Sequence, residues 1–200
     1  MRIKSNWYQA SRAHTPGELA GAVAFNISRI ADNALKNTRK AKFEVAIGPQ
    51  YFAFLREFLV FLILVADRLA YRQFSSEDRV AFTSALANHV GATYAENISR
   101  LMGGELGACK QQFIEALNAR AGEYAEFDYT ENGPEYAFMR YLAYCMSQIM
   151  DEKDSGWVID QIISIEAPNA IDMLEGNFKG LLDAKPAKTR PARKRLTQQT

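Results

Sequence analysis

The apolar stretch at residues 51–71 is the feature that most constrains how this chain can fold. It reads YFAFLREFLVFLILVADRLAY, and its longest run without a charged residue, 58–66, is only nine residues long. A membrane-spanning helix needs about 20 predominantly apolar residues, and charged pairs flank this run on both sides. A helix that is apolar nearly all round is typical of the centre of a helical protein. We therefore expect a central helix over about 50–72 that other helices cover.

The composition favours helices over strands. The chain has 29 alanines, the strongest helix formers, against seven valines. No segment alternates apolar and polar residues over a strand-like length, and the single Asn-Gly pair, at 132–133, is followed by Pro134 between two helical patterns. The sequence therefore predicts an all-α fold.

Capping residues and breakers divide the chain into six or seven helices. Thr15 before Pro16 and Glu18 is a helix start signal, as is Ser75 before two acidic residues, and Asp154 or Ser155 is expected to cap a later helix. The predicted helices cover about 16–39, 49–72, 76–102, 105–124, 134–150, 157–168 and 170–182. Pro168 is expected to end or kink its helix. We find no internal repeat and predict an N-terminal arm at 1–14, one helical bundle domain at 15–183 and a tail at 184–200.

Charge is distributed unevenly although the formal net charge is only +1. Residues 1–42 carry eight basic and two acidic residues, and residues 43–183 carry ten basic and 21 acidic ones. The tail carries six basic residues and no acidic one. This balance excludes a uniformly basic nucleic-acid binder and a uniformly acidic disordered chain. The basic residues of the tail, which we predict to be disordered, are Lys185, Lys188, Arg190, Arg193, Lys194 and Arg195.

Three roles are open for this tail. It can contact nucleic-acid phosphates without reading sequence, hold the protein to anionic lipid, or serve only solubility. The body of the chain has no recognisable helix-turn-helix, so sequence-specific DNA binding has little support. The N-terminus lacks the apolar segment of a secretory signal, and the two cysteines form no disulfide framework, so we expect a cytoplasmic protein.

The histidines and cysteines form no recognisable catalytic or metal-binding motif. Di-iron bundles need Glu-x-x-His pairs, but Ser11 and Leu86 stand three residues before His14 and His89. His89 lies seven residues from Glu96 on one helix face, which suits a general base, although no nucleophile accompanies it. Cys109 and Cys145 lie in helical patterns, and we favour buried structural thiols. The glycine-rich segment 103–107 joins two helices and lacks a phosphate-loop lysine. No cofactor or metal is therefore predicted, and the sequence favours a protein that is not an enzyme.

Four charged residues of the central helix form the most informative constellation: Arg56, Glu57, Asp67 and Arg68. The first and third are eleven residues apart, as are the second and fourth, so each pair shares a stripe of the helix. If the helix is central, these charges are partly buried and need partners. They form either a polar pocket in the bundle or, as we favour, ion pairs at its two ends.

Aromatic residues gather in and around the central helix: Tyr51, Phe52, Phe54, Phe58, Phe61, Tyr71, Phe74 and Phe82. Such a set is most often core, and otherwise a homo-oligomer interface or the lining of an apolar ligand cavity. Because no catalytic motif is present, the sequence favours a protein that acts through protein–protein contacts as a homo-oligomer. The alternatives are an accessory module whose basic tail contacts nucleic acid or anionic membrane, and a binder of an apolar small molecule in the helical core.

Overall fold

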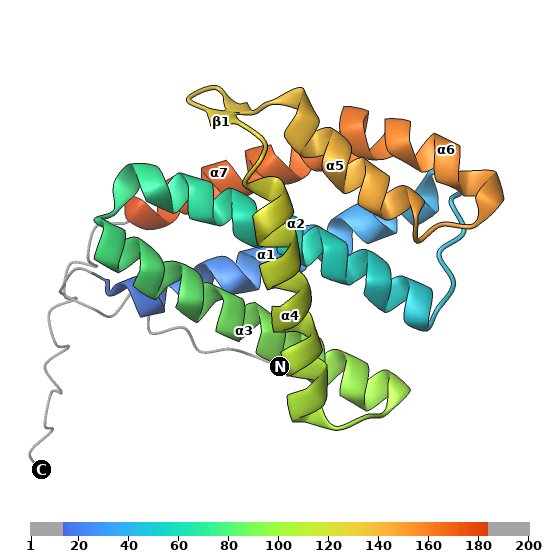
Figure 1. Cartoon of the computed structure of the whole chain (residues 1–200), viewed down its shortest axis with the longest axis horizontal. Coiled ribbons are helices and arrows are strands. Elements are labelled where there is room, and N and C mark those ends of the chain that lie inside the picture. The colour runs from blue at the N-terminus through green and yellow to red at the C-terminus, as the bar shows by residue number, and fades with distance from the viewer. Residues whose placement is uncertain (1–13, 184–200) are drawn as a thin grey trace, which may run out of the picture.

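The computed structural model describes residues 14–183, and these residues are almost entirely helical (Figure 1). In chain order the elements are α1 (Pro16–Lys40), α2 (Pro49–Gln73), α3 (Ser76–Met102), α4 (Leu106–Tyr124), β1 (Tyr129–Thr130), β2 (Gly133–Pro134), α5 (Tyr136–Ser147), α6 (Glu152–Gln161), a π-helical turn (Ile162–Glu166) and α7 (Ala167–Leu182). The all-α prediction is confirmed. None of the described helices combines the length and the apolar content required to cross a membrane.

Helix α2 lies at the centre of the fold and contacts α1, α3, α4, α5 and α7 (Figure 1). Every residue from Glu57 to Ile63 is buried, which amounts to almost two full turns. Since successive residues on a helix point in different directions, neighbours must cover α2 on all sides over this length. In Figure 1, α4 crosses the longer helices at a steep angle and leads to the group formed by α5, α6 and α7.

Local capping sets the starts of the long helices. Thr15 and Glu18 form the expected capping box before α1, and the Ser75 hydroxyl accepts a hydrogen bond from the amide of Asp78 at the start of α3. Gly103 and Gly104, with φ of 80° and 102°, separate α3 from α4. These caps satisfy amides that have no partner within their own helix.

The predicted helix over 134–150 is shorter in the structure and follows a small hairpin. Thr130 pairs with Gly133 across a two-residue loop, and Pro134 belongs to β2 rather than opening α5. Gly133 adopts a φ of 105°, which the hairpin requires and which a residue with a side chain rarely adopts. The Asn-Gly pair therefore marks a turn that the sequence interpretation passed over.

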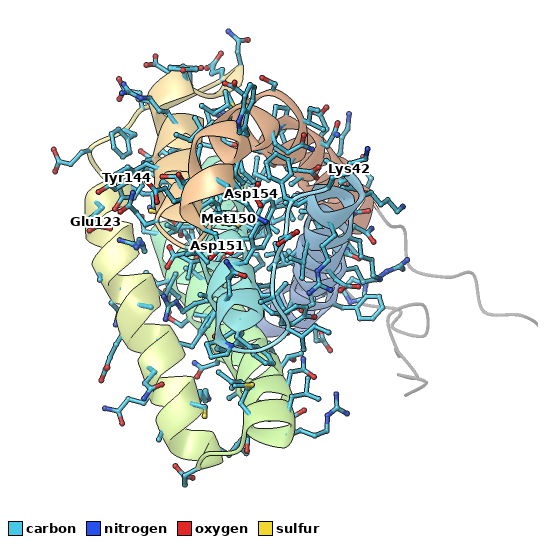
Figure 2. All side chains as sticks on the ribbon, turned by 90° about the vertical axis from the view of Figure 1, so that its right-hand side faces the viewer. Lys42, Glu123, Tyr144, Met150, Asp151 and Asp154 are labelled. Atoms are coloured by element: carbon cyan, nitrogen blue, oxygen red, sulfur yellow. The ribbon has the colours of Figure 1, made fainter. Side chains whose placement is uncertain are left out.

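The sixth helix begins earlier than predicted, at Glu152 instead of about residue 157. Asp154 and Ser155 lie inside this helix and do not cap it; the Asp154 carboxylate instead accepts a hydrogen bond from the amide of Glu44 at 3.0 Å. Figure 2 shows Asp154 near Asp151 and Met150, where α5 leads into α6. The chain between α1 and α2 is thereby attached to the start of α6.

Pro168 neither ends its helix nor interrupts the helical path. The amide of Ala167 bonds to the carbonyl of Ile162, the wider spacing of a π-turn, and α7 continues directly from it. Proline has no amide hydrogen and clashes with the carbonyl of the preceding turn, so a local widening lets the helix proceed. Residues from Glu152 to Leu182 therefore form one continuous helical stretch.

Most of the aromatic set predicted around the central helix lies in the core. Phe52, Phe54, Phe58, Phe61 and Phe82 are buried, whereas Tyr71 is 68% exposed. Further rings from distant elements pack against them. The distance between ring centres is 5.7 Å for Phe138 and Phe61, and also 5.7 Å for Phe178 and Phe82. The chain's own helices thus cover the aromatic side chains that suggested an oligomer interface.

Candidate functional site

Two of the four charged residues that the sequence singled out on α2, Asp67 and Arg68, have partners near its C-terminal end. Asp67 accepts hydrogen bonds from Arg79 Nε at 3.0 Å and from Thr83 Oγ1 at 2.7 Å, both on α3. Arg68 donates to the backbone carbonyl of Tyr124 at 3.4 Å. These contacts join α2 to the start of α3 and the end of α4.

The other two, Arg56 and Glu57, belong to a separate network between α2, α4 and α5. Glu57 is 4% exposed and accepts from Arg120 Nε at 2.8 Å and from Arg56 Nη2 at 3.2 Å. Arg120 also donates to Glu123 at 2.8 Å and to the Tyr141 hydroxyl at 3.1 Å. Within residues 14–183, no hydrogen bond or ion pair connects this network to the charges at positions 67 and 68. The four residues therefore do not form one cluster.

The electrostatics of this network hold its charges in place. Burial lowers the pKa of Arg120, but its hydrogen bonds to Glu57 and Glu123 outweigh this and leave that pKa above its usual range. The Tyr141 hydroxyl donates to Glu123, and together with Arg120 it lowers the pKa of that carboxyl. In Figure 2, Glu123 of α4 and Tyr144 of α5 lie on the same side of the molecule. The network has paired charges and suits a structural role.

Neither the thiols nor His89 forms a catalytic pair in the described chain. Burial raises the pKa of Cys145 to about 11, so this thiol is protonated at neutral pH and is a poor nucleophile. Cys109 is half-buried on α4. His89 is exposed, and no hydrogen bond or ion pair joins it to Glu96. Across residues 14–183, no three His, Cys, Asp or Glu side chains gather closely enough to hold a metal ion.

A groove of about 530 Å³ runs between α1 and α3, with α2 as its floor. We call it the α1–α3 groove. Its lining consists of Gly21, Ala24, Phe25, Ser28, Arg29 and Asp32 from α1, of Tyr51, Phe52, Leu55 and Leu59 from α2, and of His89, Val90, Thr93, Tyr94 and Asn97 from α3. The α1 residues recur every three or four positions and so form one stripe along about three turns. The floor is aromatic and aliphatic, whereas most polar groups stand on the walls.

The hydroxyls on the walls are held by their own helices. Ser28 Oγ donates to the carbonyl of Ala24 at 2.9 Å, and Thr93 Oγ1 donates to the carbonyl of His89 at 3.1 Å. Each hydroxyl oxygen keeps lone pairs that face outward from its helix. These groups are therefore suited to accept hydrogen bonds from a bound molecule.

The charged groups of the groove are not equivalent. Asp32 pairs with Lys36 at 2.6 Å, so its charge is balanced nearby. Arg29 forms no ion pair with a carboxylate of residues 14–183, and its guanidinium lies 5.8 Å from the centre of the Phe25 ring. Phe25 itself is 49% exposed at the rim. Arg29 and Phe25 thus place a cation and an apolar ring together at the edge of the groove.

Phe52 and Tyr94 form one wall of the groove and separate it from a second, smaller pocket. Their rings meet edge to face at 6.0 Å, and the Tyr94 hydroxyl donates to the carbonyl of Phe52 at 3.2 Å. Burial raises the pKa of Tyr94, while the nearby charge of Arg56 lowers it. Arg56 lines the second pocket, which lies between α2, α3 and α4.

The predicted contacts of the basic tail lie outside the described residues: Lys185, Lys188, Arg190, Arg193, Lys194 and Arg195. Its role in binding nucleic acid or anionic membrane stays a prediction.

Comparisons with protein-family models, with curated proteins and with solved structures find no match for this chain. The function of this protein is therefore inferred from the geometry of its own residues.

The sequence interpretation missed most of the groove. It named Tyr51 and Phe52 as possible lining of an apolar cavity and His89 as a base beside Glu96, but it did not single out Arg29 or Asn97. The small residues Gly21, Ala24 and Ser28 at helical spacing are the signal that α1 leaves space beside its apolar face. Which helix faces that space is a tertiary property that the local pattern does not contain.

Proposed function

We propose that this protein binds a small molecule with an apolar body in the α1–α3 groove. The single observation that carries the proposal is the groove's shape and lining: about 530 Å³ over a floor that includes Tyr51, Phe52 and Leu55. Sites for small ligands occupy roughly 300–1,000 Å³ and combine apolar walls with a few polar groups. The groove meets both conditions.

The polar groups of the groove support a ligand with one polar or acidic head. Arg29, which forms no ion pair with the described carboxylates, supplies a cation for an acidic group, and the hydroxyl oxygens of Thr93 and Ser28 can accept from a hydroxyl or amine of the ligand. Since these groups stand on the walls while the floor is apolar, the head would lie near the rim and the body would lie against α2. The proposal takes up the sequence-based alternative of an apolar ligand.

The experiment compares two exposed residues on α3 that differ in one respect. Thr93 and Asn88 each donate a side-chain hydrogen bond to a carbonyl four residues earlier, but only Thr93 lines the groove. Thr93→Phe therefore fills the groove, and Asn88→Phe adds the same ring elsewhere on the helix. The probe is anilinonaphthalene sulfonate, which carries apolar rings and one anionic group, and binding is measured by isothermal titration calorimetry.

The proposal expects saturable binding to the wild type, at least about tenfold weaker binding to Thr93→Phe and unchanged binding to Asn88→Phe. Equal affinity of all three proteins would show that the probe binds elsewhere and would overturn the proposed site. Circular dichroism of each variant checks that the helices are intact.

Exposed aromatic residues on α5 and α6 favour self-association as a second candidate function. Tyr136 and Tyr144 are eight residues apart on α5 and are 61% and 54% exposed, and Trp157 on α6 is 71% exposed. Tyr and Trp are enriched at protein interfaces. Light scattering of the full chain tests this candidate: a concentration-dependent dimer that Tyr144→Ser and Trp157→Ser weaken supports it, and a strict monomer at high concentration contradicts it.

A further inference from the structure

Arg56 has a buried donor that no protein atom of the described chain satisfies. Its Nη2 bonds to Glu57 at 3.2 Å, but its Nε is buried and donates to no atom of residues 14–183. A buried N–H without an acceptor disfavours the folded state, but this atom has almost no surface that a bound molecule can reach, so a ligand must contact the rest of the guanidinium.

The positive charge of Arg56 is paired less closely than that of Arg120. Its carboxylate partner in residues 14–183, Glu57, is shared with Arg120, which makes the shorter contact at 2.8 Å and also pairs with Glu123. The side chain of Arg56 is 37% exposed, so it is accessible from outside. An anionic group that contacts the exposed part of the guanidinium would therefore add a second negative charge beside Arg56.

A pocket of about 210 Å³ lies beside Arg56, between the start of α2, the end of α3 and the start of α4. Its walls are mostly apolar, with Phe52, Ile98, Met102 and Phe113 among them. The volume equals that of about seven liquid water molecules, which is enough for a small organic acid. One cation at the edge of an apolar pocket matches a carboxylate attached to a short apolar chain or ring.

We propose that this pocket is a binding site for a small monocarboxylate, whose oxygens accept hydrogen bonds from Arg56. The apolar walls favour the hydrocarbon part of such a ligand over a fully hydrated inorganic anion such as phosphate, whose charge needs more donors. The proposal does not depend on the function proposed for the α1–α3 groove, because Arg56 lines only the smaller pocket.

The test titrates the full-length protein with butyrate, benzoate and inorganic phosphate and follows binding by isothermal titration calorimetry. Arg56→Lys keeps the charge but removes the planar set of donors, and we expect it to weaken carboxylate binding about tenfold. Arg100→Lys is the control, since Arg100 is exposed on α3 and, among the residues that the structure describes, bonds only to Asn97, at 3.2 Å. This control leaves the affinity unchanged.

A second variant tests the pocket without altering Arg56. Ala53 lines the pocket but not the groove, so Ala53→Leu fills the smaller space alone. We expect it to reduce carboxylate binding at least about tenfold and to leave binding of anilinonaphthalene sulfonate unchanged. Absence of saturable carboxylate binding to the wild type would overturn the proposal. Equal binding by Ala53→Leu, or tighter binding of phosphate than of butyrate and benzoate, would overturn it too.

Discussion

Glu57 carries a buried negative charge whose arginine partners come from two helices. Removing its charge leaves Arg120 facing an uncharged group in a partly buried place, and breaking a fully buried pair costs about 3–5 kcal/mol. Because Arg120 keeps Glu123 and is 28% exposed, we expect Glu57→Gln to lower the free energy of unfolding by a smaller amount, about 2 kcal/mol.

The matched control for this change is Asp32→Asn, which removes the exposed ion pair with Lys36 and should cost less than about 0.5 kcal/mol. Urea unfolding followed by circular dichroism measures both changes. Equal losses for the two variants would mean that the Glu57 network contributes no more than a surface ion pair.

Glu166 is the other buried carboxylate of residues 14–183, and its partners are neutral. It is 2% exposed, and it accepts hydrogen bonds from Gln161 at 2.9 Å and Asn37 at 3.4 Å. Burial raises the pKa of Glu166, and the two amides only partly offset this. The protonated form is therefore favoured by the folded state relative to the unfolded chain.

The consequence is a specific pH dependence. A carboxyl whose pKa is raised on folding contributes stability below its ordinary pKa of about 4.3, and this contribution is lost as the pH rises through the folded pKa. Glutamine stays neutral at every pH. We therefore expect the free energy of unfolding of Glu166→Gln, relative to that of the wild type, to be higher at about pH 7.5 than at about pH 4, as measured by urea unfolding at both values. A difference that is constant with pH, or that changes in the opposite direction, would contradict this account.

At the scale of elements, the helix starts that depend on neighbouring residues were predictable, and those that depend on distant residues were not. The capping box at Thr15 and the serine at position 75 act within one turn, so the sequence contains the whole signal. Asp154 has the composition of a cap, but its carboxylate binds the amide of Glu44, which is 110 residues away. The π-turn before Pro168 likewise relieves the clash between the proline ring and the carbonyl of the preceding turn, and the spacing of apolar residues in the sequence does not predict it.

The same distinction explains the site residues. The sequence identified the charges of α2 and the need for partners, but Arg120 lies 63 residues from Glu57 and carries no local mark of that pairing. Arg79 is closer in sequence to Asp67, only 12 residues away, because α2 and α3 are joined by a short turn. Partner choice thus becomes predictable only where the connection is short.

The packing of α3 against α4 brings Phe113 close to a buried glycine on α3. Gly91 is buried, and a methyl group added there would lie 3.1 Å from Phe113 Cδ1, whereas Gly122 on α4 has open space. Alanine is favoured over glycine inside a helix by about 1 kcal/mol, so Gly122→Ala should stabilise the protein by up to that amount.

At Gly91 the displacement of Phe113 opposes this gain, and overpacking costs about 1–3 kcal/mol. We therefore expect Gly91→Ala to be at least about 1 kcal/mol less stable than Gly122→Ala. Thermal unfolding by calorimetry compares them. A Gly91→Ala protein as stable as Gly122→Ala would show that α3 and α4 are less tightly packed than described.

At the scale of the whole molecule, the fold uses its most apolar helix as a centre and leaves its hollows between the surrounding helices. The aromatic residues that the sequence offered as an oligomer face are largely consumed by this core, with Phe54, Phe58 and Phe61 fully buried. Among the hollows that stay open are the α1–α3 groove and, across Phe52 and Tyr94 from it, the smaller pocket that Arg56 lines. We therefore propose binding in these two hollows and not on the exposed surface of α2.

Native mass spectrometry of freshly expressed protein tests this central claim most directly. The account predicts that the wild type and Asn88→Phe carry a small molecule whose mass adds to that of the chain, and that Thr93→Phe, with the groove filled, does not. Wild-type protein that shows only the mass of the chain in repeated preparations, or an adduct that Thr93→Phe and Ala53→Leu both retain in full, would contradict it.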